Sequence, residues 1–299
     1  SWFSYDCLGF PFHYGIRMDR GYVMFVPQNH VSFHNITVTA DFNCTTPDLN
    51  RASKSSIFVF LDISFENIFL ELVDSNFYNL TWVLDIHFKT SKRKSDGTFL
   101  NVNIENSNFS NIRNGAIFIA LSKSITPLVL GEVVINNSTF SDVFTSGQGS
   151  ALYITSESYH SVDKRNVTVD IRNSNFTNCI SHGNGASIFI GKYIKATLTK
   201  VVLISNLINP YLGKGLLYFG EDALTLSGVI FQIHDLLIST VILRSFKFVT
   251  TADMQLICPD WYFPLVSYNT DSSIALSCRS CEGTLFAPFQ GSFSITYDT

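Results

Sequence analysis

The chain has 299 residues, of which 46% are hydrophobic and only 15% are charged, and its net charge is −4. The charged share is well below the roughly 25% of an average globular domain, so we expect much of the chain to be buried. The net charge offers no basic field for nucleic acid, and we expect no such partner. No apolar run reaches the roughly 18 residues that a membrane span needs, so we expect no span in this chain.

Eight Asn-X-Ser/Thr triplets, the acceptor pattern for N-linked glycans, lie within the first 180 residues. They predict a glycoprotein of a eukaryotic secretory pathway, located outside the cell or on its surface. The chain begins at Ser1 rather than Met, as in a mature protein after signal removal or a piece of a longer one. The triplets at Asn136 and Asn137 overlap, and crowding allows only one to be occupied. The predicted sites are Asn35, Asn43, Asn79, Asn108, Asn137, Asn166 and Asn175.

A short motif recurs along the chain and ends in Phe in four of its five copies. Its last residues lie 32, 31, 36 and 31 positions apart, and a period this regular indicates a solenoid. The copies are Leu70–Phe77, Val102–Phe109, Val133–Phe140, Val169–Phe176 and, more weakly, Lys200–Leu207.

Each copy predicts a strand followed by a tight turn. The positions seven and five residues before the end, such as Val102 and Ile104, are apolar and alternate with polar ones, which indicates a strand with one face inward. Three residues before the end stands Asn or Asp, which tolerates the left-handed backbone of a turn, and the final Phe then enters the core on the next face. The fifth copy departs from the pattern at two positions, with Lys200 seven residues before its end and Ile204 three residues before it.

A second strand follows a glycine in four of the copies. Glycine supplies a backbone angle that other residues avoid. Polar segments such as 122–126 and 156–166 then lead to the next copy, and we interpret them as loops that absorb the change in spacing from 31 to 36 residues. The second strands are expected at 115–119, 149–154, 185–190 and 215–219.

The period and the alternation predict an all-β chain that forms a right-handed parallel β-helix, a solenoid of about eight turns. Leucine-rich repeats have shorter periods, helical repeats need a 3.6-residue periodicity, and propeller blades need about 40 residues or more. We expect the β-helix, including an N-terminal cap, to span residues 1–257. A small Cys-containing β segment is expected at 258–299.

The repeats resemble those of pectin-lyase-like and polymorphic-membrane-protein β-helices over about residues 70–220. The bacterial adhesin repeat reads Phe-x-x-Asn and Gly-Gly-Ala-Ile, and the Phe-to-Asn spacing here is one residue shorter. The sequons favour a eukaryotic source, and protists carry many large secreted β-helix proteins of this general type. The matching segments are Phe109–Asn111, Phe176–Asn178, Asn114–Ile117 and Asn184–Ser187.

The cysteines suggest disulfides at both ends of the chain. The tail, with CP at 258–259 and CRSCEGTL at 278–285, is similar to ephrin-receptor-like modules, which read Cys-x-x-Cys-x-x-Gly-Thr-Tyr. This resemblance implies a disulfide between Cys258 and Cys278 and leaves Cys281 in need of a partner. We expect Cys7 and Cys44 to tie the N-terminal cap that a solenoid needs. Cys179 follows a turn, and we expect a buried thiol there.

No constellation of residues in the sequence indicates catalysis or a metal site. The acidic residues share no column of the repeat, whereas glycoside hydrolysis needs two carboxylates roughly 5–10 Å apart. The Cys278-x-x-Cys281 pair lacks a second pair that would complete a zinc site. The triplet 269–271 copies that of polygalacturonases, but the partner motifs of that family are absent. We therefore predict no enzyme and no metal, and no cofactor apart from N-linked glycans.

Three functions remain open. Low charge, a stiff rod and two open ends favour a structural protein that associates end to end into a filament or surface coat. The first alternative is an adhesin or receptor ectodomain that binds a cell-surface or matrix partner, or a glycan, through its loops. The second is a carbohydrate-active β-helix enzyme, which would need an acidic cleft.

Two roles are open for Asn108 and Asn175, which precede the final Phe of their copies. At a corner they would face outward and carry glycans, or they would stack their amides into a buried ladder along the helix. We expect glycans at both positions, with Asn106 and Asn173 forming the turn.

Overall fold

The structure, a computed structural model, is built of β-strands, with no helix among the described residues. It describes residues 2–5, 16–19, 22–25, 30–40, 56–60, 67–80, 82–88, 98–121, 129–156, 165–191, 194–204, 207–208, 217–219, 224–227, 229–232, 240–244, 254–258, 262–268 and 274–280.

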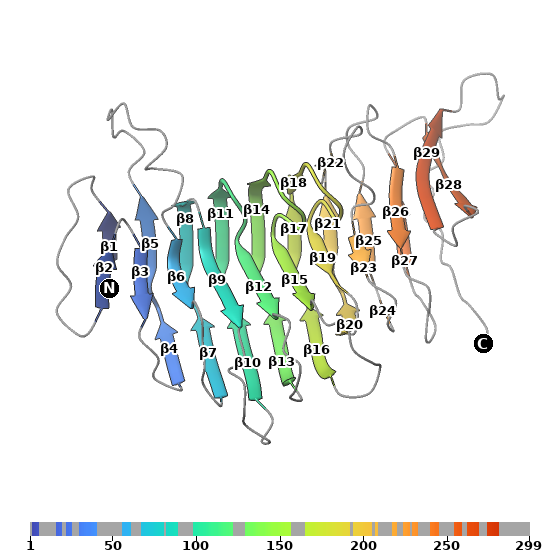
Figure 1. Cartoon of the computed structure of the whole chain (residues 1–299). Coiled ribbons are helices and arrows are strands. Elements are labelled where there is room, and N and C mark those ends of the chain that lie inside the picture. Colours follow the sequence, from blue (N-terminus) through green and yellow to red (C-terminus); the bar gives the residue numbers. More distant parts are fainter. Residues whose placement is uncertain are drawn as a thin grey trace.

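Successive turns of the chain stack into three sheets, which we name A, B and C (Figure 1). Sheet A follows the order β1 (Trp2–Tyr5), β5 (Thr37–Ala40), β8 (Asn76–Leu80), β11 (Asn108–Ile112), β14 (Thr139–Thr145), β17 (Asn175–Thr177), β21 (Val202–Ile204), β25 (Val229–Gln232) and β27 (Met254–Ile257). Two short strands extend it beside β14, namely β18 (Ile180–Ser181) and β22 (Leu207–Ile208).

Sheet C has seven strands, in the order β24 (Leu224–Ser227), β20 (Ile194–Thr199), β16 (Arg165–Arg172), β13 (Val129–Asn136), β10 (Thr98–Glu105), β7 (Asn67–Val73) and β4 (His30–His34). Sheet B follows the order β2 (Ile16–Asp19), β3 (Tyr22–Phe25), β6 (Ser56–Phe60), β9 (Trp82–Phe88), β12 (Ile117–Leu121), β15 (Leu152–Ser156), β19 (Ile188–Ile190), β23 (Leu217–Phe219), β26 (Thr240–Arg244), β29 (Ile274–Ser280) and β28 (Tyr262–Tyr268).

Parallel pairing places equivalent residues of successive turns side by side. In sheet C, Ile104 of β10 pairs with Leu72 of β7 and with Ile135 of β13. In sheet A, Phe109 lies between the Phe residues of the preceding and following turns. The predicted parallel β-helix is therefore confirmed. Each turn has one strand more than expected, because the Phe lies on a sheet A strand of its own and not at the end of a corner.

The core contains a continuous column of phenylalanine rings. Phe77, Phe109, Phe140 and Phe176 are fully buried. Their ring centroids lie 5.1, 4.6 and 4.9 Å apart along the column, and the rings are nearly parallel. Burying a side chain of this size stabilises a fold by roughly 1.5–3 kcal/mol, so the column ties each turn to the next.

The turn between sheets C and A has the left-handed backbone that the sequence predicts. The φ angles of Asp74, Asn106, Asn137 and Asn173 lie between 47° and 51°. The residue that follows each of them is a buried serine, whose Oγ donates to the carbonyl oxygen two residues earlier over 2.7–2.9 Å. In three of these serines the Oγ also accepts a hydrogen bond from the backbone N–H of the equivalent serine in the preceding turn. The polar groups of this serine column therefore have hydrogen-bond partners inside the core.

The expected alignment of the fifth copy is wrong by four residues. Leu203 pairs with Phe176, so Leu203 and not Leu207 continues the phenylalanine column. Lys200 is the turn residue, with a φ of 53°, and Val201 takes the place of the buried serine. The alignment followed the letters SNL at 205–207, which resemble the SNF and STF endings of the other copies. Stacking on the preceding turn instead holds Lys200 in the left-handed conformation of the turn.

Antiparallel strands terminate sheet B at both ends. At one end β2 pairs with β3, and at the other β29 pairs with both β26 and β28. A disulfide joins Cys258, directly after β27 of sheet A, to Cys278 of β29, and these are the two cysteines that the tail resemblance paired. β28 and β29, which follow residue 257, belong to the same sheet as β26, and the boundary at 257 stays a prediction.

Candidate functional site

Sheet B carries a column of aromatic side chains on its outer face. Phe118 of β12 pairs with Tyr153 of β15, which pairs with Phe189 of β19. The centroids of these rings lie 4.7 and 4.9 Å apart, and the rings are nearly parallel. Ile117 and Ile119 beside Phe118 are buried, so the aromatic column occupies the face opposite to the core. Phe118 and Tyr153 are partly exposed to solvent.

Trp82, the first residue of β9, stands next to this column but outside the stack. Its ring centroid lies 5.9 Å from that of Phe118, and the two ring planes are at 89°. The six-membered ring of Trp82 packs near Gly115, where an added Cβ would lie 3.5 Å from it. The indole is partly exposed, so it is available to a ligand in a different orientation from the stacked rings.

A pocket of about 250 Å³ opens where this aromatic column meets the turns that lead from sheet A to sheet B. That volume is small against the 300–1,000 Å³ typical of sites for drug-sized ligands. It is lined by three aromatic residues, three polar uncharged residues, three glycines and one isoleucine, namely Trp82, Phe118, Tyr153, Asn114, Thr145, Gln148, Gly115, Gly147, Gly149 and Ile117.

An insertion in the turn from sheet A to sheet B forms one wall of the pocket. Ile112 pairs with Val143 and Ile117 with Leu152, so the turn after Val143 is four residues longer than the turn after Ile112. The interpretation that polar loops after the second strand absorb the jump in spacing is thus largely wrong. Four of the five extra residues lie in this turn, which contributes Thr145 and residues 147–149 to the pocket.

Glycines with positive φ shape this turn and the one before it. Gly149 has a φ of 58°, and an added Cβ would overlap the carbonyl oxygen of Leu152 and the backbone of Phe189. Gly115, with a φ of 116°, lies two residues before the start of β12 in the turn before. Their backbone angles confirm the expectation that glycine precedes the second strand for a conformational reason.

The lining of the pocket has no ionisable side chain apart from the phenol of Tyr153. A glycosidase or lyase needs carboxylates or a basic group at the reacting centre, so this lining suits binding better than acid–base chemistry. Among the residues that the structure describes, no group of three or more His, Cys, Asp or Glu side chains is placed to hold a metal ion.

On sheet C, a hydroxyl, an imidazole and a carboxylate meet at Ser32, His34 and Glu71. The Oγ of Ser32 donates to Oε2 of Glu71 over 2.9 Å and lies 2.6 Å from Nε2 of His34. A hydroxyl has one proton, so the imidazole donates to Oγ and does not accept from it. In a catalytic triad the imidazole stands between the other two groups and deprotonates the serine. This exposed arrangement is therefore not a triad.

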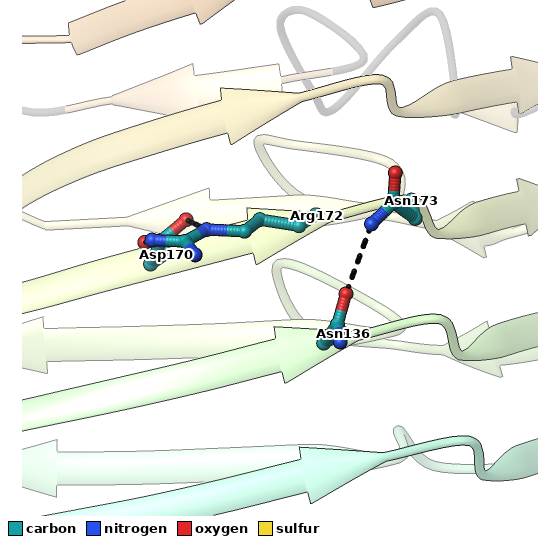
Figure 2. A network of polar contacts seen from close by, with 4 residues as sticks. All are labelled: Asn136, Asp170, Arg172 and Asn173. Atoms are coloured by element: carbon teal, nitrogen blue, oxygen red, sulfur yellow. Dashed lines mark hydrogen bonds and ion pairs between the residues drawn. The ribbon is translucent and has the colours of Figure 1, made fainter.

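Asparagine side chains form ladders on the outer edge of sheet C. Asn173 Nδ2 donates to Asn136 Oδ1 over 3.1 Å, beside the ion pair between Arg172 and Asp170 (Figure 2). The hydrogen bond and charge of Asp170 raise the pKa of the Arg172 guanidinium. In the preceding turns Asn137 Nδ2 donates to Asn106 Oδ1 over 2.8 Å. These ladders are exposed, and their members are turn residues and Asn136 at the end of β13, not Asn108 and Asn175.

A second column of left-handed residues was not foreseen from the sequence. It bends sheet A after the phenylalanine column and contains Asn79, Asn111, Asp142 and Asn178, with φ between 52° and 57°. Asn111 Nδ2 donates to Asn79 Oδ1 over 2.7 Å, and Asn178 Nδ2 donates to Asp142 Oδ1 over 3.1 Å. Asp142 has no donor to offer Asn111, so the ladder is interrupted there. The recurrence of Asn two residues after Phe was the available signal.

The described sequons lie on sheet A, on the turn that precedes it, and on sheet C. Asn106 and Asn173 form the turn as expected, and the neighbouring Asn175 is exposed while Asn108 is partly buried. Asn166 lies on strand β16, not in the loop where we expected it. Asn43 lies outside the described residues. None of the sequons falls on the described strands of sheet B, and whether any of them carries a glycan stays a prediction.

The remaining predicted site residues have mixed outcomes. Cys179 is a buried thiol, as expected, and burial raises its pKa to about 12. Its sulfur contacts the carbonyl oxygen of Phe140 at 3.8 Å. Cys7, Cys44 and Cys281, together with the triplet 269–271, lie outside the described residues.

A comparison with protein-family models, curated proteins and solved structures finds no match for the chain. The fold and the pocket are therefore the basis for any functional assignment. Within the described part of the chain, no helix has the length and apolar character of a membrane span.

Proposed function

We propose that the protein is an extracellular adhesin or receptor ectodomain that binds a neutral saccharide in the pocket beside Trp82. The observation that carries the proposal is the lining of that pocket, in which aromatic rings and uncharged amides meet on an outward face. The disulfide between Cys258 and Cys278 supports an oxidising, extracellular location.

The chemistry of the lining matches the chemistry of a sugar ring. A pyranose presents C–H bonds on its faces and hydroxyl groups around its rim, so it packs on an aromatic ring while it exchanges hydrogen bonds with amides. Trp82 stands perpendicular to Phe118, so it is the ring that we assign to the sugar face. Gln148 and Asn114 offer donors and acceptors without charge. A charged ligand would find no counter-ion among these residues.

The outer face of sheet B is also the face that the protein's own glycans leave open. The described strands of sheet B contain no sequon, whereas those of sheets A and C do. Glycans on sheets A and C would restrict access to those faces. A ligand that is part of a larger glycan or cell surface would then approach sheet B.

Binding to an array of neutral, N-acetylated and acidic oligosaccharides tests the proposal. We expect the purified protein, with its own N-glycans trimmed, to bind neutral or N-acetylated members. Trp82→Ala should weaken that binding tenfold or more, since truncation of a central Trp in a binding site typically costs upwards of about 2 kcal/mol. Calorimetry on the strongest oligosaccharide would measure the change.

Phe99→Ala is the matched control for this experiment. Phe99 is a partly exposed aromatic residue on sheet C, where it contacts Phe69 with the ring centroids 5.7 Å apart. Its removal should leave saccharide binding unchanged. Equal losses in the two variants, or binding to acidic oligosaccharides alone, would contradict the assignment of the pocket.

A self-assembling filament or surface coat is our second proposal. It is favoured by the parallel strands at the ends of sheets A and C, since β1, β27, β4 and β24 each have an edge that no described strand covers. The antiparallel pairs at both ends of sheet B work against stacking of that sheet. Negative-stain microscopy of native material should show rods of several protomers, and strictly monodisperse monomers would count against the filament.

Kinship with the pectin-lyase-like and polymorphic-membrane-protein-like β-helices is likewise a proposal. The glycine-containing turn at Asn114–Ile117 and the parallel sheets support it. A catalytic role is our least favoured reading, because the pocket has no carboxylate among its lining residues.

A further inference from the structure

We infer that N-linked glycans form a staggered belt along sheet A, with one glycan on each of five successive turns. The belt rests on the proposed extracellular location but not on the saccharide pocket. Its members would be Asn35, Asn79, Asn108, Asn137 and Asn175.

The register of sheet A places these asparagines in three columns. The turn column contains Asn35, Asp74, Asn106, Asn137 and Asn173. The backbone N–H of each donates to the carbonyl oxygen of the last residue of the sheet C strand in the following turn. The first-strand column pairs Asn76, Asn108, Thr139 and Asn175. The bend column is the left-handed one that begins at Asn79.

Acceptor triplets never occupy neighbouring turns of one column. In the turn column Asn35 and Asn137 are acceptors, and the residues between them are not. In the first-strand column Asn108 and Asn175 are acceptors, and Thr139 separates them. Neighbouring strands lie about 4.8 Å apart, which is too close for two branched glycans projecting in the same direction. The stagger gives each glycan at least twice that spacing within its column.

The asparagine ladders are compatible with these glycans. In glycosylation, the Nδ2 of asparagine bonds to the anomeric carbon of a lipid-linked oligosaccharide, loses one proton and displaces the lipid diphosphate. One N–H remains, so Asn137 can still donate to Asn106. Asn79 takes part in its ladder through Oδ1, which the reaction does not change.

The geometry of the turn also decides which of the overlapping acceptor triplets, at Asn136 and Asn137, carries the glycan. Asn137 is exposed at the turn, where its side chain leaves the sheet. Asn136 is partly buried at the end of β13, and its Oδ1 accepts from Asn173 of the next turn (Figure 2). Only one of these adjacent asparagines can be occupied, and Asn137 is the more exposed of the two. We therefore assign the glycan to Asn137.

Glycopeptide mapping of the full chain, secreted from eukaryotic cells behind a supplied signal peptide, tests the belt. Enzymatic release of glycans in heavy-oxygen water marks each formerly occupied asparagine. We expect marks at all five belt positions and none at Asn136. Asn136→Gln is the matched control and should leave the mark at Asn137 in place. A mark at Asn136, or an unmodified belt position in secreted protein, would overturn the assignment.

A second variant tests the stagger itself. Arg113→Thr turns the exposed Asn111 into an acceptor directly beside Asn79 in the bend column. Secreted protein should carry a glycan on one of these two asparagines but not on both. Molecules with both would overturn the steric argument while leaving the extracellular location intact. A complete lack of glycans at every sequon would instead refute the secretory location on which the belt rests.

Discussion

At the scale of single residues, the phenylalanine column is the part of the sequence with the clearest physical meaning. Phe140 is fully buried and lies between two parallel rings, with centroids 4.6 and 4.9 Å away. Phe144, four residues later on the same strand, is 37% exposed and contacts the ring of His182 edge-on. The two residues are identical in chemistry and differ only in the face of β14 that they occupy.

Phe140→Ala should therefore lower the free energy of unfolding by about 3–5 kcal/mol, the usual cost of truncating a buried aromatic side chain. Chemical denaturation followed by circular dichroism measures the change. Phe144→Ala is the control and should cost less, because more than a third of the Phe144 surface is already exposed to water. Equal costs would mean that the column does not carry the packing energy that its burial indicates.

At the scale of elements, the left-handed turn decides where each sheet C strand ends and each sheet A strand begins. Asparagine is suited to the turn because its short polar side chain tolerates positive φ. Lys200 shows that tertiary stacking holds a less suited residue there as well. The buried serine after the turn adds a second requirement, because its hydroxyl satisfies backbone groups inside the core.

Asn106→Ala should destabilise the fold, whereas Asn106→Gly should be better tolerated. Alanine at a φ of 49° suffers the Cβ clash of the left-handed region, which costs roughly 1–2 kcal/mol per residue, and glycine does not. Both variants lose the hydrogen bonds to Asp74 and Asn137 equally. The difference between their unfolding free energies thus measures the cost of placing a Cβ at positive φ in this turn. Alanine as stable as glycine would contradict a strained turn.

At the scale of the whole molecule, the solenoid is held together by contacts between neighbouring turns, with a covalent link at one end. The disulfide connects the last described strand of sheet A, β27, to β29 of sheet B. A solenoid's terminal turns have a neighbour on one side only, so they open more readily than the interior. The disulfide stabilises the end where packing contributes least.

Replacing both cysteines, Cys258→Ser with Cys278→Ser, should lower stability by about 2–4 kcal/mol. The loss should be local, since each turn contacts only its neighbours. Hydrogen exchange should increase in β26, β28 and β29 and stay unchanged in β10, β13 and β16. A uniform increase through all three sheets would show that the protein unfolds as one cooperative unit.

Much of the fold was predictable from local patterns. Alternation along Val102–Ile104, the turn at Asn106 and the buried Phe109 follow from side-chain period and backbone preference alone. The alignment of the fifth copy was not predictable, because Lys200 and Val201 are unusual choices for their positions. The third strand in each turn was missed because Asn111 and its equivalents bend it and break the alternation that marks a strand.

The candidate site was less predictable than the fold. Phe118, Tyr153 and Phe189 are spaced 35 and 36 residues apart, and no sequence pattern says that a strand's outer residues will stack into one column. The sequence by itself determined which residues of each turn face inward, because period and backbone preference act over a few neighbouring positions. Only the tertiary structure decided how turns of unequal length align, since that depends on stacking across the sheets. The longer turn after Val143 and its pocket beside Trp82 are products of that stacking.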